Sequence, residues 1–152
     1  MHVLGHVART ANALEGQPER AQLPRLWSHA PELAAAHGPD RLRAVYFDYE
    51  GDHEAPYTVL VGVEVPERVE PADAPEGMAL VSVPAADCLV FPARGPMPQA
   101  VVDAWQEVWD AFPSGTTGRA YSFDVEVYGP QGADLYIAVR PGARPAERAG
   151  GG

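Results

Sequence analysis

Apolar and polar residues alternate most regularly near the C-terminal end of the chain. Between Tyr121 and Tyr128 every second residue is apolar, and the residues between them include two carboxylates. The segment 133–139 repeats this alternation. Side chains on a strand point to opposite faces in turn, so each segment predicts a strand with one buried face. Gly129-Pro-Gln-Gly132 between them has the composition of a turn, which predicts a β-hairpin.

The register that we expect for this hairpin pairs Tyr128 with Asp134 and Glu126 with Tyr136. It gathers the apolar residues on one face, where helices can bury them, and a slip of one residue would mix the two sets. The other face would then carry acidic and aromatic side chains, namely Asp124, Glu126, Tyr128, Asp134 and Tyr136. Acidic and aromatic groups together are what a pocket for an organic cation needs.

The rest of the hydrophobic pattern predicts further strands and two helical regions. Segments rich in β-branched and aromatic residues are expected to be strands at His2–Arg9, Leu42–Glu50, Tyr57–Val65, Met78–Val83 and Asp87–Ala93. Apolar residues recur at spacings of three and four in Pro18–His37 and Pro98–Phe112, so both predict helices. Pro31 predicts a break within the first of them. We expect Thr10–Gln17 to be a polar connection.

The order of these elements is repeated in the two halves of the chain. Trp27 and Trp105 occupy matching places in the two helical regions. We therefore expect an α+β fold of two strand-helix-strand-strand modules, related by a pseudo-two-fold axis, with an antiparallel sheet and a ligand cleft at the module junction. The modules would span about residues 1–66 and 77–140 of a single domain. Residues 141–152 hold no large apolar side chain, so we expect a disordered tail there.

The composition narrows the choice of partners. The chain has 152 residues and a formal charge of −10, from 21 acidic and 11 basic residues, which opposes direct DNA binding and favours cationic ligands. The lone cysteine excludes an intrachain disulfide, and the five scattered histidines lack metal-ligand spacing, so we expect neither a metal nor a cofactor. No stretch resembles a signal peptide or a membrane span, so we expect a cytoplasmic protein without membrane association.

Several runs of sequence resemble one family, and they occur in that family's order. They include Val7-Ala-Arg-Thr-Ala-Asn12, Tyr46-Phe-Asp-Tyr-Glu-Gly-Asp52, Ala104-Trp-Gln-Glu-Val-Trp109 and Asp124-Val-Glu-Val-Tyr128. From about His2 to Arg140 the chain is similar to the GyrI-like small-molecule-binding domain, the effector-binding domain of AraC-type and MerR-type multidrug regulators. Within that group it most resembles the stand-alone, integron-associated effector-binding proteins. Several ordered runs are far more specific than one motif.

This resemblance implies a buried pocket carboxylate at Glu126 that faces lipophilic cations, with Tyr128 as its aromatic partner. Val125 departs from the family pattern, which often has an aromatic residue at that position, and the change would reshape the apolar side. No helix-turn-helix precedes the first expected strand. The chain therefore resembles the sensor without the DNA reader, and control of transcription would need a separate protein partner.

The residues that we expect to contact a ligand combine the acid with aromatic side chains from both modules. They are Glu126, Tyr128, Tyr136, Trp105, Tyr46, Trp27, Phe91 and Asp134. Structural roles stay open for several of them: Glu126 could be an exposed strand carboxylate, and Asp124 and Asp134 could be solvated strand ends. Tyr46 could belong to ordinary sheet packing. The tryptophans could be core anchors only, although we expect Trp105 to line the cleft and Trp109 to pack internally.

Three functions fit these observations. The first is a stand-alone protein that senses or sequesters lipophilic, cationic aromatic compounds. The second is a self-protecting hydrolase that opens the cyclopropane ring of DNA-alkylating natural products, as some stand-alone members of the resembled family do, with Glu126 activating water. The third is an acidic antagonist of a DNA-binding enzyme such as gyrase. The sequence favours the first and leaves open whether the chain is an enzyme.

Overall fold

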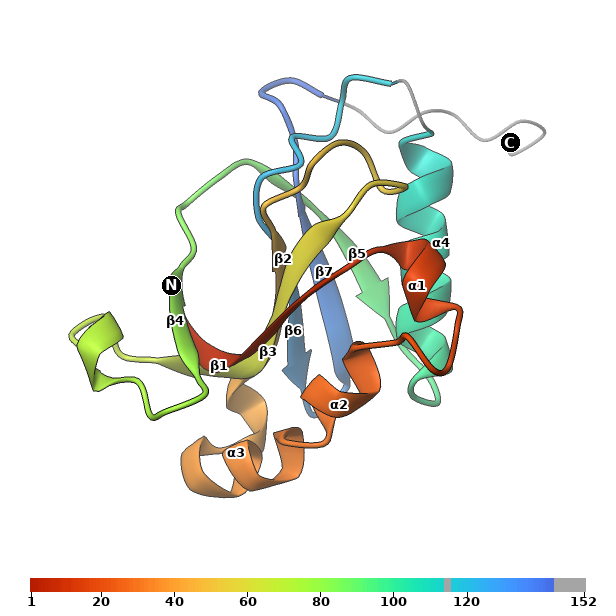
Figure 1. The fold of residues 1–152 in the computed structure, drawn as a ribbon. Helices are drawn as coiled ribbons and strands as arrows, with labels where there is room; N and C mark the ends of the chain where they lie inside the picture. Colours follow the sequence, from red (N-terminus) through yellow and green to blue (C-terminus); the bar gives the residue numbers. More distant parts are fainter. Residues whose placement is uncertain (114–115, 144–152) are drawn as a thin grey trace.

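One antiparallel sheet organises the molecule, and Figure 1 shows this sheet with its helices. The structure is a computed structural model, and it describes residues 1–113 and 116–143. The sheet has seven strands in the order β4-β1-β3-β2-β6-β7-β5. The strands are β1 His2–Thr10, β2 Leu42–Phe47, β3 Tyr57–Val65, β4 Ala79–Ser82, β5 Cys88–Ala93, β6 Asp124–Gly129 and β7 Gly132–Ala138. Antiparallel strands with a few helices confirm the predicted α+β class.

Proline positions explain where the helices begin. The helices are α1 Asn12–Glu15, α2 Leu23–Trp27, α3 Ala30–His37 and α4 Gln99–Ala111, with short 3₁₀ turns η1 Pro39–Arg41 and η2 Pro71–Asp73. Pro24 and Pro31 each stand in the first turn of a helix, where a missing N–H breaks no intrahelical bond. The predicted region Pro18–His37 is therefore divided into α2 and α3. The short helix α1 lies in a segment that we expected to be a polar connection.

The strand order confirms the predicted pseudo-two-fold arrangement. In the first half β3 lies between β1 and β2, and in the second half β7 lies between β5 and β6. The two halves meet where β2 pairs with β6, around Val45 and Val125. Strand β4 stands outside this symmetry because it pairs with β1, whereas the sequence grouped it with the second module.

The hairpin register differs from our prediction by one residue. Glu126 pairs with Leu135, and Tyr128 pairs with Ala133, because Gly129 and Gly132 close a two-residue loop. A glycine is needed at position 132, where φ is +126°. The predicted register would have required a loop of one more residue. As a consequence Glu126 shares its face with Leu135, and the helices cover this face of the sheet rather than the face of Phe123.

The core on the helix-covered face has two parts. Under α4, Val108 packs with Leu135 and Ile137, and all three are fully buried. Under α2, Leu26 packs with Ala44 and Val61. Full burial of each large apolar side chain contributes about 1.5–3 kcal/mol. Trp105 contacts both parts, so the space between α2 and α4 lies over the junction of the two halves.

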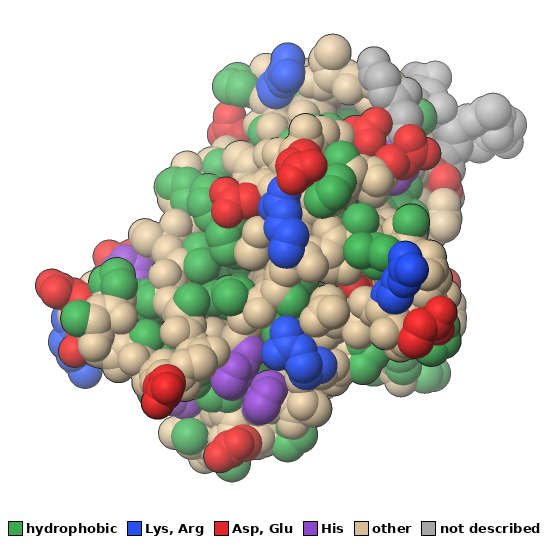
Figure 2. Space-filling view, in the orientation of Figure 1, with side chains coloured by type: hydrophobic (Ala, Val, Ile, Leu, Met, Phe, Trp, Pro, Cys, Tyr) green, Lys and Arg blue, Asp and Glu red, His purple; other side chains and the backbone are tan. Residues whose placement is uncertain are grey.

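The opposite face of the sheet holds a separate apolar cluster around Val3, Val45, Leu60 and Val125. On the surface shown in Figure 2, basic side chains are scattered among acidic and apolar ones instead of forming a continuous patch. Among the residues that the structure describes, no helix has the length and apolar character needed to cross a membrane.

Candidate functional site

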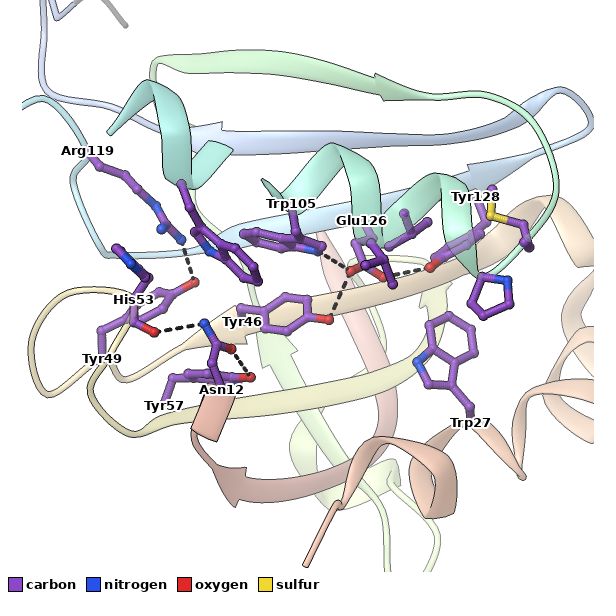
Figure 3. A pocket seen from close by; sticks show the side chains of 15 residues that line it. Asn12, Trp27, Tyr46, Tyr49, His53, Tyr57, Trp105, Arg119, Glu126 and Tyr128 are labelled. Carbon is purple, nitrogen blue, oxygen red and sulfur yellow. Dashed lines mark hydrogen bonds between the residues drawn. The ribbon is translucent and has the colours of Figure 1, made fainter. Parts of the chain in front are cut away.

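A cavity of about 330 Å³ lies between α4 and the first half of the sheet. Tryptophan and tyrosine residues form much of its wall, and Figure 3 shows the side chains that line it. They are Asn12, Trp27, Tyr46, Tyr49, His53, Tyr57, Met97, Pro98, Val101, Val102, Trp105, Trp109, Arg119, Glu126 and Tyr128. This volume and composition are typical of sites for small organic molecules.

Glu126 is the acidic residue of this wall, and its side chain is almost fully buried, with 1 % exposed. It lies in the middle of the sheet because β6 pairs with β2, where the small Ala44 stands directly opposite. Its Oε2 accepts hydrogen bonds from the Tyr46 hydroxyl at 2.9 Å and from the Trp105 indole at 2.7 Å. Its Oε1 accepts one from the Tyr128 hydroxyl at 2.6 Å. All three donors are neutral groups.

The environment of Glu126 shifts its pKa. Burial raises the pKa of Glu126 above its usual value, and the hydrogen bonds from Tyr128, Trp105 and Tyr46 oppose that rise because they favour the carboxylate. Burial and the nearby Glu126 carboxylate raise the pKa of Tyr46 and Tyr128, so both hydroxyls keep their protons and act as donors. The site therefore holds a desolvated acid that neutral donors stabilise only in part.

Aromatic rings from four elements surround this carboxylate. Tyr46 from β2 meets Trp105 from α4 edge-on, with centroids 5.0 Å apart. Trp27 at the end of α2 meets Tyr128 edge-on at 5.1 Å. The position of α2 is fixed by Glu15, whose carboxylate accepts the backbone N–H groups of Gln22 and Leu23 at 2.9 and 3.0 Å.

A second buried acid, Asp124, has a different environment. Its Oδ2 accepts hydrogen bonds from Arg119 at 2.8 Å and from the Tyr49 hydroxyl, and its Oδ1 accepts the backbone N–H of Ala138 at 2.9 Å. Both residues are buried: the exposed fraction is 0 % for Asp124 and 2 % for Arg119. Asp124 is thus a buried ion-pair partner and not a solvated strand end, while Glu126 has neutral donors only.

The structure brings together five of the residues that the sequence selected. Glu126, Tyr128, Trp105, Tyr46 and Trp27 all line the cavity, and their contact with a ligand stays a prediction. Trp109 lines it too, although we expected that residue to pack internally.

Three selected residues lie elsewhere. Tyr136 is 37 % exposed on the other face of the sheet, and Asp134 on that face pairs with Arg94 at 2.9 Å. The one-residue difference in register put them there. Phe91 packs into the core under α4, because it pairs with Leu135. None of the three forms part of the cavity wall, so their predicted place in the cleft is wrong.

Sequence reasoning missed other parts of the wall. Val101 and Val102 belong to the same apolar side of α4 as Trp105 and Trp109, so their helical spacing could have identified them. Asn12, His53 and Arg119 carried no such signal: Asn12 opens a one-turn helix, and the other two lie in irregular segments. Periodicity gives no information on residues of that kind.

Comparisons with known proteins agree with the fold. Residues 1–139 match the family described as Cass2, integron-associated effector binding protein. An integron cassette protein from the mobile metagenome of Vibrio cholerae has a similar structure, with a TM-score of 0.78 and 32 % identity over 92 % of this chain and 90 % of that one. The comparison with curated proteins gave no significant match.

Two more distant structures share the fold at 12 % identity. One is SAV2435 bound to tetraphenylphosphonium, with a TM-score of 0.65 over 92 % of this chain and 88 % of that one. The other is a putative bacterial transcription regulation protein from Staphylococcus aureus, with a TM-score of 0.61 over 92 % of both chains. The match over residues 1–139 shows that this chain belongs to the family of integron-associated effector-binding proteins.

Proposed function

We propose that the protein binds lipophilic aromatic cations in the cavity, and that Glu126 selects for the positive charge. The observation that supports this most directly is the buried carboxylate on an aromatic wall, with hydrogen bonds from three neutral donors. An ionised group in such a place is stabilised by an opposite charge close to it. A cationic ligand would bring that charge.

The aromatic wall supports the same ligand class. The faces of Trp and Tyr rings attract cations, and each contact contributes about 0.5–2 kcal/mol, depending on how far the cation is desolvated. Trp27, Tyr46, Trp105 and Tyr128 lie around the carboxylate, so a ligand beside Glu126 would contact several rings at once. Several contacts of this size are needed for micromolar affinity, which corresponds to about 8 kcal/mol.

The ligand of a structural relative is consistent with this proposal. The solved structure of SAV2435, whose fold is similar, has tetraphenylphosphonium bound, and this ligand is both aromatic and cationic. At 12 % identity this likeness shows the fold alone. The proposal for this chain therefore depends on Glu126 and the rings around it.

A pair of isosteric ligands tests the proposal. Benzyltrimethylammonium and neopentylbenzene have almost the same shape, but only the first carries a charge. Because Trp27, Trp105 and Trp109 line the cavity, binding can be followed by tryptophan fluorescence. We expect the wild-type protein to bind the cation at least ~10-fold more tightly than the neutral isostere, a difference of about 1.4 kcal/mol. Equal affinity for the two would contradict the proposal.

A further inference from the structure

The end of the cavity away from Glu126 contains unsatisfied polar groups. Within residues 1–113 and 116–143, the buried side-chain nitrogen and oxygen atoms without a hydrogen-bond partner are Arg119 Nε, Arg119 Nη1 and His53 Nδ1. Both residues belong to the cavity wall. Buried polar groups are nearly always hydrogen-bonded, so three orphan nitrogens at one place call for an explanation.

The Arg119 guanidinium is paired with Asp124, and Arg119 also belongs to the cavity wall. Its Nη2 donates to Asp124 Oδ2 at 2.8 Å and to the Tyr49 hydroxyl at 3.3 Å. Arg119 lines the cavity, but Asp124 does not. Of this ion pair, it is therefore the positively charged partner that belongs to the wall.

The two ends of the cavity carry opposite charges and lie on either side of one aromatic residue. Trp105 donates its indole N–H to Glu126 at 2.7 Å, and the Arg119 guanidinium lies 5.6 Å from the Trp105 ring centroid. Figure 3 shows Arg119 and His53 at one end of the site and Glu126 and Tyr128 at the other. A ligand about one aromatic ring long could therefore approach both charges.

The segment that carries His53 is held in place. Asn12 donates from Nδ2 to the His53 carbonyl at 2.8 Å, and its Oδ1 accepts the Tyr57 hydroxyl at 2.9 Å. The His53 ring stacks on Trp109 with centroids 5.9 Å apart. These contacts fix His53 beside the cavity.

We propose that Arg119 and His53 form a second binding subsite, which takes a hydrogen-bond acceptor such as a carbonyl or carboxylate on the ligand. This inference rests on the proposed function, because it assumes that the positive end of the same ligand lies beside Glu126. The preferred ligand is then an aromatic cation with an acceptor on the far side of its ring. A second positive charge at that position would meet the guanidinium and weaken binding.

The orphan nitrogens are shielded from water, so an acceptor that reaches them does not compete with solvent. Of the rings beside the guanidinium, that of Tyr121 is closest, with its centroid 4.5 Å from Arg119 Cζ. The Tyr121 backbone has a left-handed φ of 54°. Non-glycine residues in that region are uncommon and cluster at ligand-binding sites.

A series of four probes tests the subsite in the wild-type protein. The probes are benzyltrimethylammonium and its derivatives with acetyl, carboxylate or trimethylammoniomethyl at the para position. A new hydrogen bond to a charged group strengthens binding by ~10-fold or more. We expect the acetyl and carboxylate probes to bind at least ~10-fold more tightly than the parent, and the dication to bind more weakly than the parent.

Two variants show whether Arg119 and His53 cause these differences. Arg119→Met combined with Asp124→Asn removes both buried charges together, and His53→Leu removes the third orphan nitrogen, His53 Nδ1. The quantity compared is the ratio of the parent Kd to each derivative's Kd within one protein, so a general change in affinity cancels. We expect the carboxylate ratio to fall to ~1 in the double variant, since the charged donor is gone, and to decrease in His53→Leu.

Each outcome separates the subsite from the proposed function. Equal Kd values for all four probes in the wild-type protein would overturn the subsite while leaving cation binding intact. Ratios that persist unchanged in both variants would overturn it as well. Failure of the parent cation to bind wild-type protein would overturn the proposed function, and the subsite with it.

Discussion

Removing Arg119 alone from its buried ion pair with Asp124 should be among the most destabilising single changes in this protein. Their side chains are 1 and 0 % exposed and lie 2.8 Å apart. Asp124 also accepts hydrogen bonds from Tyr49 after β2 and from Ala138 in β7, so it joins three segments. In Arg119→Met the carboxylate would keep two neutral donors but lose its counter-ion.

Removing one partner of a buried pair costs about 3–5 kcal/mol, because the remaining charge is left uncompensated. Removing both partners costs less, so we expect Arg119→Met with Asp124→Asn to lose no more than about 2 kcal/mol. Urea denaturation gives these free energies from the midpoint, provided that the slope is unchanged. The double variant should therefore be more stable than Arg119→Met alone.

An exposed pair on the same sheet provides the control. Arg94 and Asp134 lie 2.9 Å apart, like the buried pair, but their side chains are 49 and 32 % exposed. Exposed pairs contribute at most about 1 kcal/mol, so Arg94→Met should have little effect. If Arg119→Met were no more destabilising than Arg94→Met, the argument from burial would be refuted.

Three further predictions concern stability and partners. Burial raises the pKa of Glu126, so the native state takes up a proton at this residue at higher pH than the unfolded state does. Wild-type protein should therefore gain stability relative to Glu126→Gln as the pH falls from neutral toward about 4.5. A constant difference between their urea midpoints would contradict this. A Cβ at Gly62 would lie 1.9 Å from the Leu4 carbonyl oxygen, so Gly62→Ala should destabilise the β1–β3 pair by at least about 2 kcal/mol, and an unchanged melting temperature would argue against it. With a net charge of −10 and no broad basic patch on the face in Figure 2, the protein should not shift duplex DNA at physiological salt in a gel assay, and a sub-micromolar shift would disprove this.

The fold could be predicted well where one physical signal was dominant. The bounds of β3, Tyr57–Val65, agree with the prediction because that strand is buried at the centre of the first half. Helix α4 lies within one residue of its predicted ends, since its apolar side covers the core. Long segments with one strong period leave few alternative structures.

The hairpin register could not be settled by the same signal. The apolar rows of the two strands lie on opposite faces of the sheet, with Val125 and Val127 of β6 on one face and Leu135 and Ile137 of β7 on the other. Separation of polar from apolar residues therefore favoured the wrong register, whereas the two-residue loop between Gly129 and Gly132 fits the observed one. Because the observed register differs by one residue, Asp134 and Tyr136 lie on the face of the sheet opposite to that of Glu126 and outside the cavity wall.

The C-terminal tail lies only partly within the described residues. The tail was expected from Pro141, but Ala143 packs against the core cluster under α4. Residues 144–152 lie outside the described part of the chain, so the prediction of a disordered tail there stays a prediction. The proposed division into modules 1–66 and 77–140 also stays a prediction.

The charge preference of Glu126 is the central claim, and one calorimetric comparison tests it. Glu126→Gln keeps the shape of the side chain and an acceptor oxygen for Trp105 but removes the charge. Glu19→Gln removes the same charge from an exposed position and serves as the control. Both variants should fold. With benzyltrimethylammonium, Glu126→Gln should lose about 1–3 kcal/mol of binding free energy, while Glu19→Gln should bind as wild type does. Equal affinity in all three proteins would contradict the account, because Glu126 would then not determine which ligands bind.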